Sequence, residues 1–173
     1  MRAPKTAGLT FMEVIVYTAL LTVISVYAIT VILGMVTAFA KAKTLHRLTL
    51  DGETALERIS REVRLASAVD DASSVLGTNS SRLSLDTVKS EADSTPANKD
   101  FVVSGGRIAL QEDAGPIQYL ISPGASTTAF LVTKITTPRA QAVKIVLTLQ
   151  AGSGQNLISR SFYNTIILRQ SYP

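Results

Sequence analysis

The stretch GLTFMEVIVYTALLTVISVYAITVILGMVTAFA, residues 8–40, decides the fold of this chain. From Val14 to Ala40 it contains no charged residue. About 20 apolar residues cover the hydrocarbon core of a bilayer, and this run would reach about 40 Å as an α-helix. A carboxylate costs about 2.5–3.5 kcal/mol at the bilayer centre even on the mildest scale. Glu13, at the head of the run, is therefore expected to have a function.

The composition limits the classes of protein that remain. The chain has 173 residues, 46% of them hydrophobic, and a mean hydropathy of +0.27. Most of this apolar excess lies before Lys41. Because the chain has no cysteine, disulfides, a thiolate nucleophile and a Cys-based zinc site are excluded. The net charge of +4 is mild and does not predict a nucleic-acid-binding stripe.

Two ordinary interpretations of the apolar run leave features unexplained. In a secretory signal peptide, Ala38-Phe39-Ala40 would supply a small-x-small cleavage pattern, but the run is about twice the usual 7–15 residues. A plain single-span anchor fits the length. However, positive charges flank both ends, so the positive-inside rule does not fix its direction, and Glu13 would have no role.

A third interpretation accounts for Glu13. Gly8, followed by Leu9-Thr10-Phe11-Met12-Glu13, resembles the processing site of type IV prepilins, here after a short basic leader with Arg2 and Lys5. The resemblance implies cleavage after Gly8 by a prepilin peptidase, N-methylation of Leu9, and Glu13 as the fifth mature residue. In that family Phe is commoner than Leu as the first mature residue.

The resemblance also implies a role for Glu13 in filament assembly. A new cation at a helix N-terminus is unfavourable, and the Glu13 carboxylate of one subunit could approach the Leu9 amine of its neighbour. Such a buried pair sets register more than it adds stability. Major pilins usually carry Gly and Pro within this segment. Here Gly34 is the only glycine in it and there is no proline, as expected for a minor pilin or pseudopilin.

Beyond Ala40 an amphipathic helix is predicted over 41–69. Its apolar residues recur at spacings of three and four, and they are Leu45, Leu48, Gly52, Leu56, Ile59, Val63 and Ala66. We expect this stripe to pack against a sheet. The pairs Glu57–Arg61 and Arg58–Glu62 are assigned to the solvent side. His46, the single histidine, is interpreted as a boundary residue near the membrane.

The remainder, 70–173, is predicted to be an antiparallel β head domain. The expected strands are Arg82–Val88, Phe101–Ser104, Arg107–Gln111, Ile117–Ile121, Ala129–Thr136, Val143–Leu149 and Ile158–Leu168. Gly105-Gly106 is the clearest hairpin turn, and 90–100 is assigned to a loop. With the leader (1–8) and the membrane or filament-core helix (9–40), this gives an α+β, pilin-like fold.

The resemblance extends loosely to the larger minor pseudopilins, the J or W type. It is carried by ALERISREVRLASAV (residues 55–69), GRIALQ, IQYLIS, VKIVLTL and FYNTIILRQS, the last with Arg169 after the final strand. The implied partners are the prepilin peptidase, other pilin or pseudopilin subunits, an inner-membrane assembly platform and the lipid bilayer. The implied location is a single pass through the inner membrane, with the N-terminus cytoplasmic and the head outside.

No enzymatic function is expected. The sequence has no nucleophile–base pattern, phosphate-binding loop or metal-ligand cluster, and no cofactor is implied. Asp70-Asp71 and Glu112-Asp113 are interpreted as solvated turn carboxylates, since calcium requires 6–8 oxygen ligands. The alternative to a structural subunit is a filament-tip module that binds DNA, a surface or secretion cargo. The scattered basic residues of the head disfavour nucleic acid. Whether the machine is a pilus, a secretion system or a DNA-uptake apparatus stays open.

Overall fold

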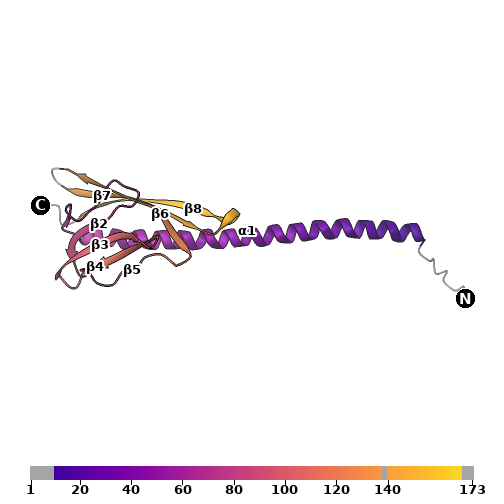
Figure 1. Cartoon of the computed structure of the whole chain (residues 1–173), viewed down its shortest axis with the longest axis horizontal. Coiled ribbons are helices and arrows are strands. Elements are labelled where there is room, and N and C mark those ends of the chain that lie inside the picture. Colours follow the sequence, from indigo (N-terminus) through magenta and orange to yellow (C-terminus); the bar gives the residue numbers. More distant parts are fainter. Residues whose placement is uncertain (1–9, 138–139, 169–173) are drawn as a thin grey trace, which may run out of the picture. The chain divides into compact units, whose positions relative to one another are not determined.

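The computed structural model describes residues 10–137 and 140–168. It has one long N-terminal helix, α1 (Phe11–Leu65), followed by antiparallel β-structure, an α+β fold (Figure 1). The chain divides into two compact units, Met1–Ala42 and Lys43–Pro173, called here the N-terminal unit and the C-terminal unit. The predicted cleavage residues Gly8 and Leu9, and Arg169, lie outside the described residues.

The strands of the C-terminal unit form two antiparallel sheets, where one sheet was expected. The five-stranded sheet has the order β1-β2-β3-β4-β5, with β1 (Ala68–Val69), β2 (Leu83–Val88), β3 (Pro96–Ser104), β4 (Arg107–Glu112) and β5 (Gln118–Tyr119). The three-stranded sheet consists of β6 (Ala125–Thr136), β7 (Gln141–Ala151) and β8 (Ile158–Ile167). A short 3₁₀ turn, Gly154–Asn156, joins β7 to β8.

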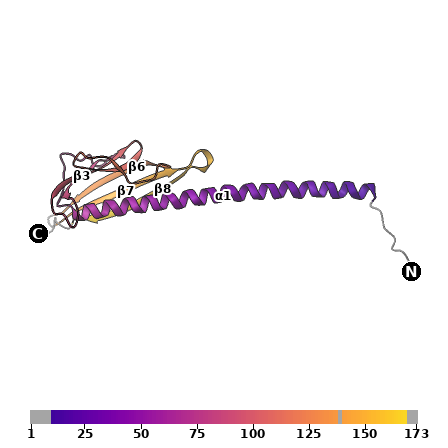
Figure 2. The same ribbon diagram turned by 90° about the horizontal axis from the view of Figure 1, so that it is seen from below.

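The C-terminal part of α1 lies along the strands of this unit (Figure 2). One face of this part of the helix packs into the core. The predicted stripe is buried at Leu48, Gly52, Leu56, Ile59, Val63 and Ala66. Leu45 is the exception, because its side chain is 42% exposed. Gly52 is required by close packing: a Cβ there would lie 2.3 Å from ring atoms of Phe162.

The helix ends earlier than predicted, at Leu65 and not at Val69. The N–H of Ser67 donates to the carbonyl of Asp86 at 2.9 Å, which draws the chain into the pairing of β1 with β2. Val63, Ala66 and Val69 are all buried. Their helix-like spacing of three therefore continues into extended backbone, and this explains why the sequence pattern overran the helix.

The Gly105-Gly106 hairpin is confirmed. Both glycines have positive φ, +56° and +73°, as a two-residue hairpin turn of type I′ requires, and Ser104 pairs with Arg107 across it. The predicted end of the 90–100 loop is wrong, because β3 already begins at Pro96. Polar residues suggested a loop there, but Lys99 is buried with its ammonium paired to Glu62.

Candidate functional site

The start of α1 places the predicted assembly residue, Glu13, in a reciprocal contact with Thr10. The N–H of Thr10 donates to Oε2 of Glu13, and the N–H of Glu13 donates to Oγ1 of Thr10, both at 3.4 Å. This is the arrangement of a capping box, and the Glu13 N–H also donates to the backbone carbonyl of Thr10 at 3.1 Å. Sequence reasoning missed it, although the T-x-x-E spacing was readable.

The Glu13 carboxylate is held by its own helix and is also exposed. The hydroxyl of Tyr17, one turn further on, donates to Oε1 of Glu13 at 3.5 Å. Both residues are exposed. Because a carboxylate offers about four acceptor positions, Glu13 can keep these contacts and still accept from a donor on another molecule. An acid in the first turn also complements the positive end of the helix dipole.

The segment that follows is apolar, and its serine and threonine hydroxyl groups form hydrogen bonds within the helix. Hydroxyl groups within it donate to carbonyls three or four residues earlier, at 2.7–2.9 Å: Thr18, Thr22, Ser25, Thr30 and Thr37. Such bonding removes the cost of placing a hydroxyl in hydrocarbon. The helix is long and apolar enough to cross a membrane, with a mean hydropathy of 2.4 over its best 18-residue window. A signal sequence meets the same criterion of length and composition.

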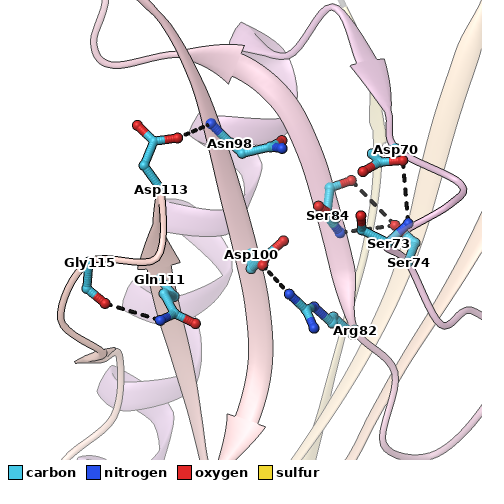
Figure 3. A network of polar contacts seen from close by, with 10 residues as sticks. All are labelled: Asp70, Ser73, Ser74, Arg82, Ser84, Asn98, Asp100, Gln111, Asp113 and Gly115. Carbon is cyan, nitrogen blue, oxygen red and sulfur yellow. Dashed lines mark hydrogen bonds and ion pairs between the residues drawn. The ribbon is translucent and has the colours of Figure 1, made fainter.

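Several described polar residues of the C-terminal unit are paired with one another. Arg82 pairs with Asp100, and Asn98 N–H donates to Asp113 at 2.7 Å (Figure 3). Lys134 pairs with Asp71 at 2.6 Å. Among the described residues, no group of three or more His, Asp and Glu side chains is placed to hold a metal ion.

Asp70 belongs to a turn that its own side chain organises. The Ser73 hydroxyl, followed by the N–H of Ala72, lowers the pKa of Asp70 below its usual value. The Ala72 N–H lies 2.9 Å from Oδ1 of Asp70. Asp93 is similar, because hydrogen bonds from the Thr95 side chain and backbone lower its pKa. Each carboxylate thus organises a local turn through its Oδ1 atom.

A groove of about 540 Å³ runs beside α1. It is lined by acids (Glu53, Glu57, Glu91), bases (Arg61, Arg64) and the neutral residues Leu56, Ser60, Leu65 and Asn164. Asn164 donates to the Ser60 hydroxyl at 2.8 Å, so that hydroxyl is committed to a structural bond. The mixed charges of the groove select no single class of charged ligand.

Comparison of the chain with protein-family models, with characterised proteins and with solved structures finds no match. The functional conclusion therefore depends on the residues of the chain itself.

Proposed function

We propose that this protein is a structural subunit, a minor pilin or pseudopilin, of a type IV pilus or a type II secretion-like filament. A prepilin peptidase removes residues 1–8, Leu9 is methylated, and the protein is held by a single helix in the inner membrane until assembly. The C-terminal unit lies outside the cytoplasm. No catalytic role or cofactor enters this function.

The observation that carries the proposal is the setting of Glu13. It is the one charged residue of α1 before Lys41, it lies in the first helical turn, and its carboxylate is exposed. The apolar segment that follows contains no proline, and its serine and threonine hydroxyl groups are satisfied within the helix. A helix of this kind is suited to lie first in lipid and then beside other apolar helices.

Glu13 can change partners during assembly. In the isolated chain its Oε2 accepts from the Thr10 N–H at the long distance of 3.4 Å, which is beyond the usual range for such bonds. The amine of a neighbouring mature Leu9 would be a charged donor, and charge-assisted hydrogen bonds are about twice as strong as neutral ones. A shift from the local cap to the neighbour's amine would then fix the axial register of two subunits.

The proposal is tested by filament recovery. Filaments are sheared from producing cells and purified, and the protein is quantified by mass spectrometry in the filament and membrane fractions. We expect a processed form in the filament fraction at low stoichiometry, as befits a minor subunit. Its absence from filaments, with normal levels in the membrane, would contradict the proposal.

A further inference from the structure

The last strand of the three-stranded sheet, β8, has a long free edge. It pairs with β7 through ten consecutive residues, from Ile158 opposite Ala151 to Ile167 opposite Ala142, without a register shift. Within the described residues, no strand lies on its other side. A long, regular edge of this kind is a template for pairing with another chain.

The other described edges are short or covered. β1 and β5 have two residues each. The edge of β6 is bonded to the segment 77–81: the Phe130 N–H donates to Asn79 at 2.7 Å, and the Ser81 N–H donates to Phe130 at 2.9 Å. Natural proteins usually protect their sheet edges in such ways. β8 has no proline, no bulge and one charged residue, Arg160.

The hydrogen-bond pattern identifies the free backbone groups. The Leu168 N–H donates to the Gln141 carbonyl at 3.0 Å, so even-numbered residues of β8 direct their backbone groups toward β7. Because these directions alternate along an antiparallel strand, five residues direct theirs outward. They are Ser159, Ser161, Tyr163, Thr165 and Ile167, and all five are exposed.

The side chains beside this edge specify the strand that would fit it. Cross-strand registers give three rows on the sheet face that carries the exposed Tyr163 and Ile167. The first is Leu131–Val146–Tyr163, the second Thr133–Lys144–Thr165 and the third Ile135–Ala142–Ile167. The apolar first and third rows reach the edge on either side of the polar second row. A strand added at this edge would continue the three rows if it carried apolar residues at positions i and i+4 and a polar residue at position i+2.

The positive charge of the three-stranded sheet favours an acidic residue at the polar position of the added strand, between its two apolar residues. β6, β7 and β8 contain Lys134, Lys144 and Arg160 and no Asp or Glu. Lys134 is paired with Asp71, and Arg160 donates to the Thr49 hydroxyl at 2.6 Å. Lys144 lies exposed in the polar row, on β7, with Thr165 of β8 between it and the edge. An added strand would lie about 9.5 Å from β7, which is two strand spacings, and the long side chains of a lysine and a glutamate can together bridge that distance.

A second copy of this chain does not fit the edge. Three successive contacts show that β8 runs parallel to the 43–65 part of α1: Arg160 with Thr49, Phe162 at Gly52, and Asn164 with Ser60. Antiparallel pairing of two β8 strands would reverse the 43–65 helices of the two copies, whereas subunits of one filament share a direction. Parallel two-fold pairing would place the apolar rows of the two copies on opposite faces.

We therefore propose that the β8 edge receives a β-strand from a different neighbouring subunit of the filament, with an acidic residue between two apolar ones on its outer face. The inference rests on the filament function proposed above. It assigns this sheet edge as the contact by which the C-terminal unit recognises its neighbour, through backbone hydrogen bonds for affinity and the three rows for register.

The first test changes one outward backbone group. Thr165→Pro removes an N–H that faces away from β7, a position where an edge strand tolerates proline, and Thr165→Ala retains the N–H as the matched control. We expect Thr165→Pro to lower recovery in purified filaments at least tenfold without changing the melting temperature of the full-length, detergent-solubilised protein. Thr165→Ala removes only the side-chain contribution of the polar row, so it should lose much less filament recovery than Thr165→Pro and should not change the melting temperature. Equal filament recovery of the two variants would overturn the inference.

A second measurement holds even if the proline variant is unstable. Amide exchange of the wild-type protein is compared between the solubilised form and purified filaments. The amides of Ser159, Ser161, Tyr163, Thr165 and Ile167 should exchange fast in the solubilised protein and become protected in the filament. If the protein is present in filaments but these amides stay unprotected, the edge contact is wrong and the proposed function stands. If the protein is absent from filaments, the proposed function itself is wrong. Protection on self-association in detergent would identify a second copy as the occupant and contradict the inference.

Discussion

Lys99 and Glu62 form a buried ion pair that joins β3 to α1, with 2.8 Å between Nζ and Oε2. The two side chains are 1% and 4% exposed. The ammonium also donates to the carbonyls of Val88 at 3.1 Å and Lys89 at 2.8 Å, so each of its three protons has an acceptor. Arg58 approaches the other oxygen of Glu62 at 3.1 Å. Glu62 thus lies inside the C-terminal unit and not on the solvent side to which the sequence pattern assigned it.

Lys99→Met should destabilise the protein strongly. Breaking a buried pair leaves an uncompensated buried charge and costs about 3–5 kcal/mol, and here two carbonyls also lose their donor. Lys89→Met is the control, because it removes the same charge from an exposed side chain and should change stability by no more than about 0.5 kcal/mol. Denaturant unfolding of the solubilised protein measures both variants. Equal midpoints would show that the pair contributes nothing to stability.

Gly52→Ala tests the close approach of α1 and β8. Alanine favours a helix by about 1 kcal/mol over glycine, but here its Cβ would overlap the buried Phe162 ring, and overpacking costs about 1–3 kcal/mol. We expect a lower melting temperature, with partial recovery in the double variant Gly52→Ala/Phe162→Leu. Gly34→Ala, where no atom lies within 4 Å of the added Cβ apart from the neighbouring residues and backbone of the helix itself, should cause no loss. A stabilised Gly52→Ala variant would mean that the ring moves aside freely.

Ile59→Asp tests the buried stripe of α1. Ile59 is fully buried, and burying an unpaired carboxylate is among the few mechanisms that cost more than about 4 kcal/mol. Leu45→Asp makes the same kind of change at a residue that is 42% exposed and should be nearly neutral. Circular dichroism during thermal unfolding gives the comparison. If the Ile59→Asp variant had the same melting temperature as the Leu45→Asp control, this helix face would belong to a subunit contact.

The sequence was sufficient for features that depend on local periodicity. The apolar run, the stripe from Leu48 to Val63 and the Gly105-Gly106 turn each follow from spacing or backbone freedom. It was insufficient where distant partners decide. Glu62 and Lys99 appear solvated by residue type, and each is buried because the other satisfies it. The division into two sheets likewise depends on long-range pairing, because among the described residues none of the strands β1 to β5 pairs with β6, β7 or β8.

The candidate site also combines features that local sequence predicts with features that depend on distant parts of the chain. The position of Glu13 relative to Gly8 was readable from the sequence, and so was the T-x-x-E capping pattern. The free edge of β8 was not readable. Strand existence follows from residue pattern, whereas strand order, which decides that β8 is an edge, follows from tertiary pairing.

Variants at the start of α1 separate capping from docking. Glu13→Gln retains the capping-box geometry, which accepts Glu or Gln, but removes the charge. Thr10→Ala retains the charge and weakens the cap by about 1 kcal/mol. If the carboxylate binds a neighbour's amine, Glu13→Gln should enter filaments poorly and Thr10→Ala nearly normally, with both inserted in the membrane. Filament recovery and crosslinking to neighbouring subunits are measured for both variants. If Thr10→Ala entered filaments more poorly than Glu13→Gln, Glu13 would act only as a helix cap.

The mature N-terminus tests the central claim most directly. The full-length protein is purified from membranes of cells that contain a prepilin peptidase, and its intact mass and N-terminal sequence are determined, with Gly8→Val as the variant that blocks cleavage. We expect the wild-type chain to begin at Leu9 and to carry one added methyl group, and the Gly8→Val chain to retain its leader. A mature chain beginning at Lys41 would establish a secretory signal peptide and contradict the filament-subunit function.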